Sequence, residues 1–371
     1  MNTCLHESSK TSPEDRIKLL ALSLIDGFGS RTYKKLMRLI GNISELDTCT
    51  NRDLYQVMPR DIAIKISSKQ YLHPIEEYIQ RLQRLGVSYI TMLDDEYPTL
   101  LKQIYDPPPI LYVRGKYSLK SLVRCISVVG TRACSYYGED VTRHLVSDLV
   151  QSGFTIVSGM AFGIDTIAHC SALDANGMTI AVLSGRVDKP SPQTNHIIYE
   201  RIIKDCFIIS ECPIHREINS GMFPVRNRII AGLSLGTLVI EAPVRSGALI
   251  TARIALDENR EVFAVPSNIF RKQGEGVNQL IKQGRAKLIE NVKDIIEELG
   301  FFAYNTEKKQ EIELDAEERS LLEIIQREPC SVDDISKKVK LDISSISTIL
   351  GNLEIRGVVR REMNGEYTVV V

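Results

Sequence analysis

Two arginines that bracket an asparagine, Arg226, Asn227 and Arg228, follow a proline and precede an apolar segment. Proline is favoured at the first position of a helix, so Pro224 predicts that a helix begins here. The N-terminus of such a helix exposes backbone N–H groups and partial positive charge, and both attract an anion. Guanidinium groups add donors that match the geometry of a phosphate. We therefore expect this segment to contact a phosphate-bearing ligand.

Small residues, hydroxyls and cations also follow four apolar segments elsewhere in the chain. Such residues can form an anion cradle where a strand turns into a helix, because glycine lets the backbone approach a ligand closely. The candidates are Gly130, Thr131, Arg132 and Ser135 after the first segment, Gly159, Phe162 and Gly163 after the second, Arg186 and Lys189 after the third, and Arg245, Ser246 and Gly247 after the fifth. The first turn lacks a GxGxxG pattern, so we expect no dinucleotide and no other cofactor.

The segments that precede these turns are short, apolar and separated by amphipathic helical stretches. This alternation predicts an α/β fold with a doubly wound, mostly parallel, Rossmann-like sheet that is covered on both faces. The expected strands are residues 126–130, 154–158, 179–183, 207–210, 237–241, 261–265 and 287–289. In such a sheet, ligands bind beyond the carboxyl ends of the strands.

The predicted turns therefore meet at one edge of the sheet, where their arginines would line one positive pocket. A local positive pocket on a neutral domain is typical of a site for a phosphate backbone. Phe162 and Phe223 could stack on unpaired bases, although single aromatic residues more often belong to the core. We interpret the pocket as a site for single-stranded DNA bound without sequence preference.

Two further polar residues have plainer explanations than catalysis. Asp165 could hold a ribose hydroxyl, but capping a helix explains it at least as well. His169 is more often a packed residue than a catalyst in such a position, and no nucleophile accompanies it in the sequence. We expect no catalytic residue.

The chain of 371 residues divides by composition into four parts. We predict a helical module over residues 1–85, the sheet domain over 86–300, a polar linker over 301–313 and a winged helix over 314–371. In the first module, Gly27 and Gly29 lie in a turn before a basic helix. This pattern is typical of a SAM-like or helix–hairpin–helix module, and a solvated basic face explains it equally well.

The numbers of charged residues and cysteines, and the absence of long apolar segments, limit the class of protein. Lys and Arg number 46 against 47 Asp and Glu, so nucleic acid could be bound only through local patches. The 8 cysteines contain no CxxC pair and no zinc spacing, so we expect no metal and a reducing compartment. Without a signal-like or membrane-length apolar run, a cytoplasmic location without membrane contact is expected.

The C-terminal segment predicts three helices and a hairpin whose turn is Asn364-Gly365. Its expected recognition helix, residues 344–354, carries no cation, whereas a major-groove reader usually brings several. We therefore expect the tail to contact protein, or to assist DNA binding only through Arg356, Arg360 and Arg361. Deletion of everything after Lys309 should leave most of the affinity for single-stranded DNA.

These motifs resemble the DprA/Smf family, the DNA-processing proteins of bacterial transformation. The resemblance rests on five segments in family order, VVGTRACSYYG (128–138), VSGMAFGIDTIAH (157–169), FPVRNRIIAGLS (223–234), VIEAPVRSGALITARIA (239–255) and FAVPS (263–267). It implies single-stranded DNA binding, a homodimer formed through the sheet domain, and loading of the RecA recombinase. It also implies that Arg132, Arg226 and Arg228 are the arginines of the family's GSR-type and FPxRNR motifs.

Some residues depart from the family's pattern. Thr131 stands for the usual serine, Arg186 for a glycine, and Ser267 for the glycine of a VPG segment. Ser191 precedes Pro192 where the family has tyrosine, so a base-stacking contact could be missing while Arg186 adds charge. The sequence does not determine the shape of that edge of the pocket.

An enzymatic alternative comes from the segment 231–237, which precedes Glu241. It loosely resembles the PGGxGT…E motif of nucleoside-monophosphate phosphoribohydrolases, in which a glutamate would stabilise a ribosyl cation and activate water. The proline and the paired glycines of that motif are absent here, so we favour the DNA-binding interpretation.

Overall fold

Apolar strands separated by helices build one large sheet in the part of the chain that the computed structural model describes. The described residues are 12–216, 221–301, 316–327, 330–339, 341–355, 358–361 and 365–369. They divide into two compact units, residues 1–303 and 304–371. No helix among them is long and apolar enough to cross a membrane.

The sheet of the first unit has nine strands in the order β1-β2-β6-β5-β4-β3-β7-β8-β9. The strands are β1 (Val87–Thr91), β2 (Ile110–Gly115), β3 (Cys125–Val129), β4 (Thr155–Ser158), β5 (Thr179–Val182), β6 (Phe207–Ser210), β7 (Gly236–Val239), β8 (Glu261–Ala264) and β9 (Lys287–Leu288). The last seven are all parallel and confirm the predicted strands and the doubly wound class. The first two were not predicted. They pair antiparallel with each other, and β2 pairs antiparallel with β6.

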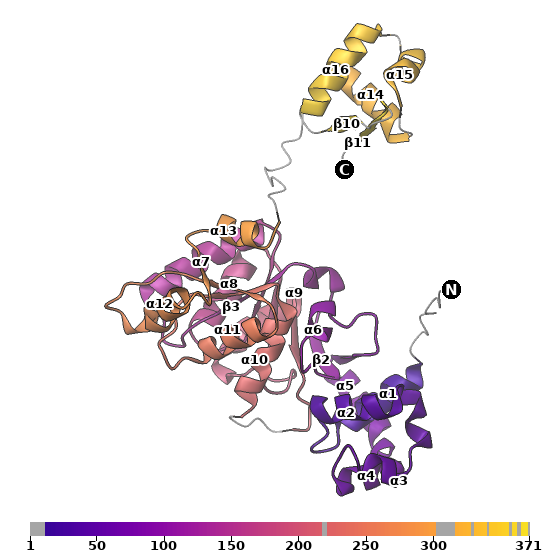
Figure 1. Cartoon of the computed structure of the whole chain (residues 1–371), viewed down its shortest axis with the longest axis vertical. Coiled ribbons are helices and arrows are strands. Elements are labelled where there is room, and N and C mark those ends of the chain that lie inside the picture. The colour runs from indigo at the N-terminus through magenta and orange to yellow at the C-terminus, as the bar shows by residue number, and fades with distance from the viewer. Residues whose placement is uncertain are drawn as a thin grey trace. The chain divides into compact units, whose positions relative to one another are not determined.

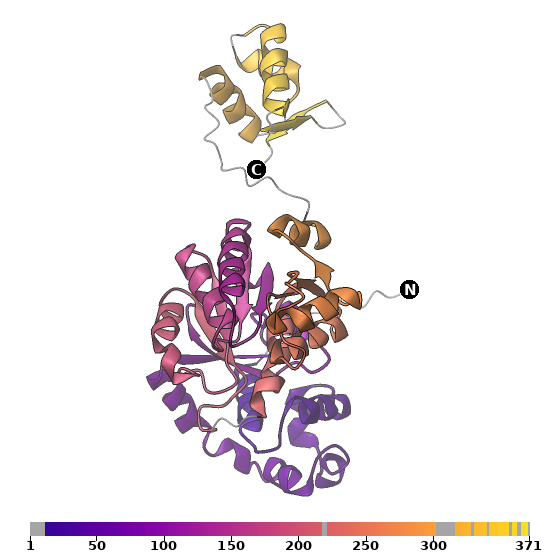
Figure 2. The ribbon, with the colours of Figure 1, turned by 90° about the vertical axis from the view of Figure 1, so that its left-hand side faces the viewer.

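Helices cover both faces of the sheet (Figure 1). Their bounds are α6 (Thr99–Lys102), α7 (Tyr136–Gln151), α8 (Ile164–Asp174), α9 (His196–Asp205), α10 (Met222–Leu233), α11 (Gly247–Asp257), α12 (Glu275–Lys282) and α13 (Val292–Glu298). One core contains apolar side chains of α6, α10, α11 and α12, and another contains those of α7, α8 and α13. Figure 2 shows the strands between these two layers from the side.

The chain reverses its direction of travel across the sheet at the central strand β3. From β3 it runs through β4 and β5 to β6, and α10 then returns it to β7, on the other side of β3. The crevice between the carboxyl ends of β3 and β7 is therefore the topological switch point, where ligands of such sheets bind.

The N-terminal helices pack directly onto one end of the sheet (Figure 1). They are α1 (Pro13–Ser23), α2 (Ser30–Ile40), α3 (Asn51–Leu54), α4 (Arg60–Ser67) and α5 (Ile75–Arg84). Their buried side chains share one core with Tyr112 of β2 and Ile208 of β6. Arg16 also pairs with Asp94 at 2.8 Å across the boundary predicted between residues 85 and 86. The helical module and the sheet thus form one compact unit.

The second unit has its own small core, which includes Leu321, Ile335 and Leu350. It consists of α14 (Ala316–Arg327), α15 (Val332–Lys338) and α16 (Ile343–Ile355), followed by the antiparallel strands β10 (Val359–Arg361) and β11 (Tyr367–Val369). This order confirms the predicted helices and hairpin. Asn364, Arg356 and most of the predicted linker lie outside the described residues.

Candidate functional site

A cavity of about 580 Å³ opens at the switch point between β3 and β7. Its walls come from the turn after β3, the turn after β4, the first half of α10 and the loop between β7 and α11. Eight of the fifteen predicted site residues line it, namely Gly130, Thr131, Arg132, Arg226, Asn227, Arg245, Ser246 and Gly247. The structure therefore brings together predicted site residues from two separate turns and from the FPVRNR segment.

Two exposed arginines supply accessible positive charge to this cavity. The guanidinium of Arg132 lies over the ring of Phe223, with 5.7 Å between its central carbon and the ring centroid. Arg245 is exposed, and neither arginine forms an ion pair with any residue that the structure describes. The stacked pair presents a cation beside an aromatic face, an arrangement that suits a phosphate and its attached base.

The third arginine of the cavity, Arg226, has a structural task. Only 6% of the residue is exposed, and one of its terminal nitrogens donates to the backbone carbonyls of Gly159 and Val182. Burial lowers the pKa of Arg226 to about 10, and the nearby Asp165 opposes this shift. The side chain stays charged at neutral pH and joins the ends of β4 and β5 at the wall of the cavity.

The helix that carries Arg226 begins earlier than predicted. It starts at Met222, so Pro224 is its third residue and the two arginines lie beyond its exposed N-terminal end. The predicted helix start at Pro224 is therefore wrong, and contact of these arginines with a ligand stays a prediction. Arg228 is buried and paired with Glu211 and with Asp106, whose Oδ2 lies 3.5 Å from its Nε, outside the cavity lining. Sequence position alone could not show which way these side chains turn.

Asp165 lies at the back of the cavity and caps the turn after β4. Its Oδ2 accepts from the backbone N–H groups of Gly159, at 3.2 Å, and Ala161, at 3.3 Å. Burial raises the pKa of Asp165, while the charge of Arg226 opposes the rise. The N-cap of α8 is Gly163, which makes no side-chain cap hydrogen bond, so the expected helix cap is wrong. Asp165 instead fixes the turn that precedes the helix.

Three of the predicted glycines are needed for packing between turns. A Cβ atom at Gly130 would lie 2.4 Å from Ile164, and one at Gly159 would lie 2.4 Å from the guanidinium of Arg226. A Cβ atom at Gly163 would lie 2.4 Å from the carbonyl oxygen of Thr131. Gly247 differs, because a Cβ atom there would meet nothing within 4 Å. Only Gly247 therefore leaves its backbone open to a ligand.

Ser135 serves the helix that follows it. Its hydroxyl accepts from the N–H of Gly138 and donates to Glu241 at 2.6 Å, while its backbone N–H donates to the same carboxylate at 2.9 Å. Glu241 is only 2% exposed. Both oxygens of this glutamate are thus held by Ser135, which disfavours the role that the phosphoribohydrolase alternative would give it.

The remaining predicted residues lie away from the cavity. Arg186 pairs with Asp188 of its own loop, so the expected free charge is neutralised within that loop. Lys189 and Phe162 are exposed and do not line the cavity. Phe223, which the sequence indicated as a possible stacking residue, does line it. Pro243, Ile250 and Thr251 also line it and were not predicted, because nothing in the sequence marks them as ligand-binding residues.

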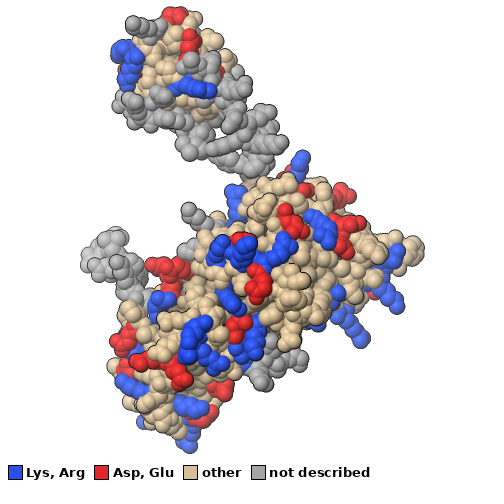
Figure 3. Space-filling view, turned by 180° about the vertical axis from the view of Figure 1, so that it is seen from behind, with Lys and Arg blue, Asp and Glu red and all other residues tan. Residues whose placement is uncertain are grey.

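Charge is mixed on one face of the molecule. On the face seen in Figure 3, Lys and Arg side chains stand beside Asp and Glu side chains. This agrees with a formal net charge of −1 for the whole chain. Any attraction for a polyanion therefore depends on local groups of unpaired arginines.

Comparison with known proteins identifies related sequences along most of the chain. A family model described as DNA recombination-mediator protein A matches residues 88–300, and the DprA winged helix domain model matches residues 305–365. Protein Smf of Synechocystis is 34% identical over 339 residues, which cover 81% of this chain and 85% of that protein. DNA processing protein DprA of Bacillus subtilis is 39% identical over 237 residues, which cover 64% of this chain and 80% of that protein.

Two solved structures share the fold. The X-ray structure of DprA from Streptococcus pneumoniae has a TM-score of 0.67 at 32% identity and covers 78% of this chain and 99% of its own. DNA processing protein A from Helicobacter pylori, described for its single-stranded DNA binding mode, has a TM-score of 0.53 at 29% identity. It covers 58% of this chain and 96% of its own.

Proposed function

The chain belongs to the DNA recombination-mediator protein A family, also called DprA/Smf, and from this membership we propose that it binds single-stranded DNA without sequence preference. The observation that carries the proposal is the exposed Arg132 stacked on Phe223 at the mouth of the cavity between β3 and β7. The description of the Helicobacter pylori relative as a single-stranded DNA binder supports it.

The exposed residues of the cavity would contact different parts of the DNA strand. Arg132 and Arg245 would hold phosphates from two different loops, because both are exposed and neither has an acidic partner among the described residues. Phe223 offers a ring to a base, and Gly247 leaves backbone open at the first turn of α11. Phosphate contacts position a strand without reading its sequence, and an aromatic face accepts any base. Such a site would not distinguish one sequence from another.

The wider role follows from the family. The chain would protect incoming single-stranded DNA and help load RecA onto it during natural transformation. It would work as a homodimer formed through the sheet domain, in the cytoplasm. These parts of the proposal rest on the family resemblance and on the DNA-processing names of the relatives.

The test is a titration with single-stranded and double-stranded oligonucleotides at two salt concentrations. We expect single strands to bind more tightly, with an affinity that falls steeply as salt rises. The variant R132A should lose at least about tenfold, because it removes a phosphate donor and the cation above Phe223. Fluorescence anisotropy measures both effects.

The matched control is R52A, which removes an exposed arginine of α3 and lies outside the cavity. It should bind like the unchanged protein. If R132A and R52A bind equally well, or if salt has no effect, the cavity is not the site.

A further inference from the structure

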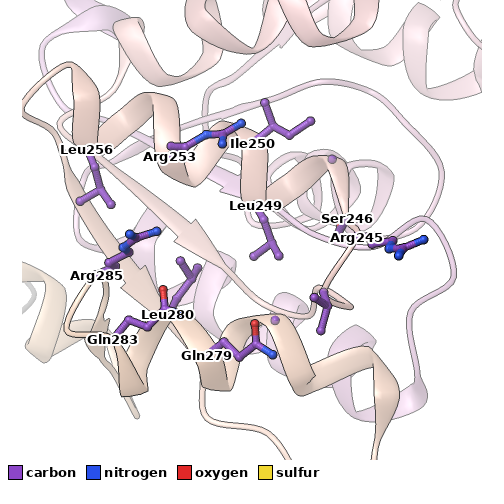
Figure 4. Close-up of a pocket in the computed structure, with 13 residues that line it drawn as sticks. Arg245, Ser246, Leu249, Ile250, Arg253, Leu256, Gln279, Leu280, Gln283 and Arg285 are labelled. Atoms are coloured by element: carbon purple, nitrogen blue, oxygen red, sulfur yellow. The ribbon is translucent and has the colours of Figure 1, made fainter.

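A second cavity, of about 440 Å³, lies between α11 and α12, next to the first (Figure 4). Four residues line both cavities, namely Arg245, Ser246, Gly247 and Ile250. The loop that begins α11 is therefore a shared wall, and the two cavities form neighbouring parts of one groove.

The charged residues that line this second cavity are all positive. Arg245, Arg253 and Arg285 line it together with Gln279 and Gln283, and no carboxylate is among its described lining residues. Figure 4 shows Arg253 and Arg285 at one end and Arg245 at the other, with Leu249 between them. Arg253 and Arg285 are exposed, and neither has an ion pair or a side-chain hydrogen bond to any described residue. Three positive charges thus face one hollow without compensation.

Several other arginines of the same unit are paired. Arg143 pairs with Glu139 at 2.8 Å, Arg201 with Asp174 at 2.7 Å, and Arg228 with Glu211. On a domain whose surface charges are mixed, unpaired arginines that gather in one hollow create a local positive potential. This potential would attract a polyanion to that place.

Local structure fixes the directions of these arginines. The buried side of α11 faces the sheet with Ala248, Ala252 and Ala255, which leaves Arg253 at the surface. Helix α12 buries Val277 and Leu280, and it ends before Gly284, whose φ of +65° turns the chain back. The N–H of Arg285 then donates to the carbonyl of Leu280 at 2.9 Å, which holds Arg285 beside the helix end.

We propose that the groove between α11 and α12 is a second phosphate-binding subsite for the same strand of single-stranded DNA. This inference rests on the proposed function, because the strand must first occupy the cavity of Arg132. From there it would pass Arg245 and the N-terminus of α11 and place later phosphates on Arg253 and Arg285. The apolar floor, with Leu249 and Leu256, would contact sugars or bases. Since Arg245 lines both hollows, one continuous polymer fits this path better than two separate small anions.

The test compares short and long single strands on the double variant R253Q/R285Q. Both side chains are exposed, so glutamine should preserve the fold, which the thermal midpoint checks. For single-stranded DNA each lost phosphate contact reduces the salt slope by about 0.7, so the double variant should lose about 1.4 in slope. At 0.1 M salt this corresponds to a roughly 25-fold weaker affinity for a strand of about 20 nucleotides. A strand of about 5 nucleotides, short enough to fill only the first cavity, should bind as before.

The matched control is K282Q. Lys282 is an exposed cation at the end of α12, and it does not line the cavity. K282Q should leave the long-strand affinity within about twofold, since Lys282 does not line the cavity and its exposed charge is screened by salt. Equal losses for K282Q and the double variant would show a diffuse charge effect and overturn the subsite. Unchanged long-strand binding by R253Q/R285Q, with R132A still defective, would overturn it too. No binding of any strand by the unchanged protein would instead refute the proposed function.

Discussion

Burial separates the arginines of the site into two roles. Arg132 and Arg245 are exposed and unpaired among the described residues, so they can exchange water for a phosphate at little cost. Arg226 is buried against the carbonyls of Gly159 and Val182 and cannot leave them without exposing unpaired acceptors. The same type of side chain is thus accessible to a ligand at one position and holds the sheet ends together at another.

The buried side chain of His169 predicts how the stability of the protein depends on pH. It is fully buried on α8, and its Nδ1 lies 2.7 Å from the hydroxyl of Thr179. Burial, together with the charge of Arg226, lowers the pKa of His169 to about 3. The folded chain therefore keeps this imidazole neutral at pH values where the unfolded chain protonates it. Its contribution to stability is present above pH 6.5 and is lost as the pH falls toward 3.

We expect the free energy of unfolding to show this difference directly. Between pH 7 and pH 5, the unchanged protein should lose about 2 kcal/mol more than the variant H169Q. Urea denaturation at the two pH values measures it. Parallel losses in both proteins would show that His169 can accept a proton in the folded state.

At the scale of elements, the site is made of turns that pack on one another. The N-terminal cap of α8, Gly163, has a φ of +74° and contacts the turn after β3 so closely that no side chain fits. That turn carries Arg132. A change in one turn is therefore passed directly to the other.

The variant G163A should disturb stability and binding together. Alanine there both adopts an unfavourable positive φ and pushes against the carbonyl of Thr131, so we expect a loss of more than about 2 kcal/mol in stability. The displaced turn should also weaken single-stranded DNA binding.

The control is G153A, at a glycine with a φ of +80° but with open space around its Cβ position. It should cost only the backbone strain, about 1 kcal/mol, and leave DNA affinity unchanged. Denaturation and anisotropy on both variants separate strain from contact. Equal losses of affinity in the two would contradict the role of the turn contact.

At the scale of the whole molecule, the two units have separate cores. The three hydrophobic clusters of residues 1–303 contain no side chain from the second unit. Helix α16, which the sequence suggested as the recognition helix, carries no Lys or Arg within its bounds. We therefore expect the second unit to add little to the binding of single strands.

A chain that ends at Lys309 tests this expectation. It should fold, because its clusters are complete, and bind single-stranded DNA with less than a tenfold change, equivalent to about 1.4 kcal/mol. Circular dichroism and anisotropy check the two points. A folded but non-binding truncated chain would assign the second unit a direct part in the site.

The sequence by itself determined the seven parallel strands, because buried strands and their helices repeat a pattern that is readable locally. It also determined that cations follow several of these strands. Because ligands bind at the carboxyl ends of parallel strands, these residues were expected at one site, and eight of the predicted residues do line one cavity. The antiparallel β1 and β2 escaped prediction, since their position beside β6 depends on contacts between distant segments.

Only the tertiary structure decided which cations are free. Arg228 pairs with the carboxylates of Glu211 and Asp106, which come from other segments of the chain. The backbone carbonyls that bind Arg226 also come from other segments. The groove of Arg253 and Arg285 exists only because α11 and α12 pack side by side on the sheet. Residue type and spacing state what a side chain can do, but its burial and partners come from segments that meet only after folding.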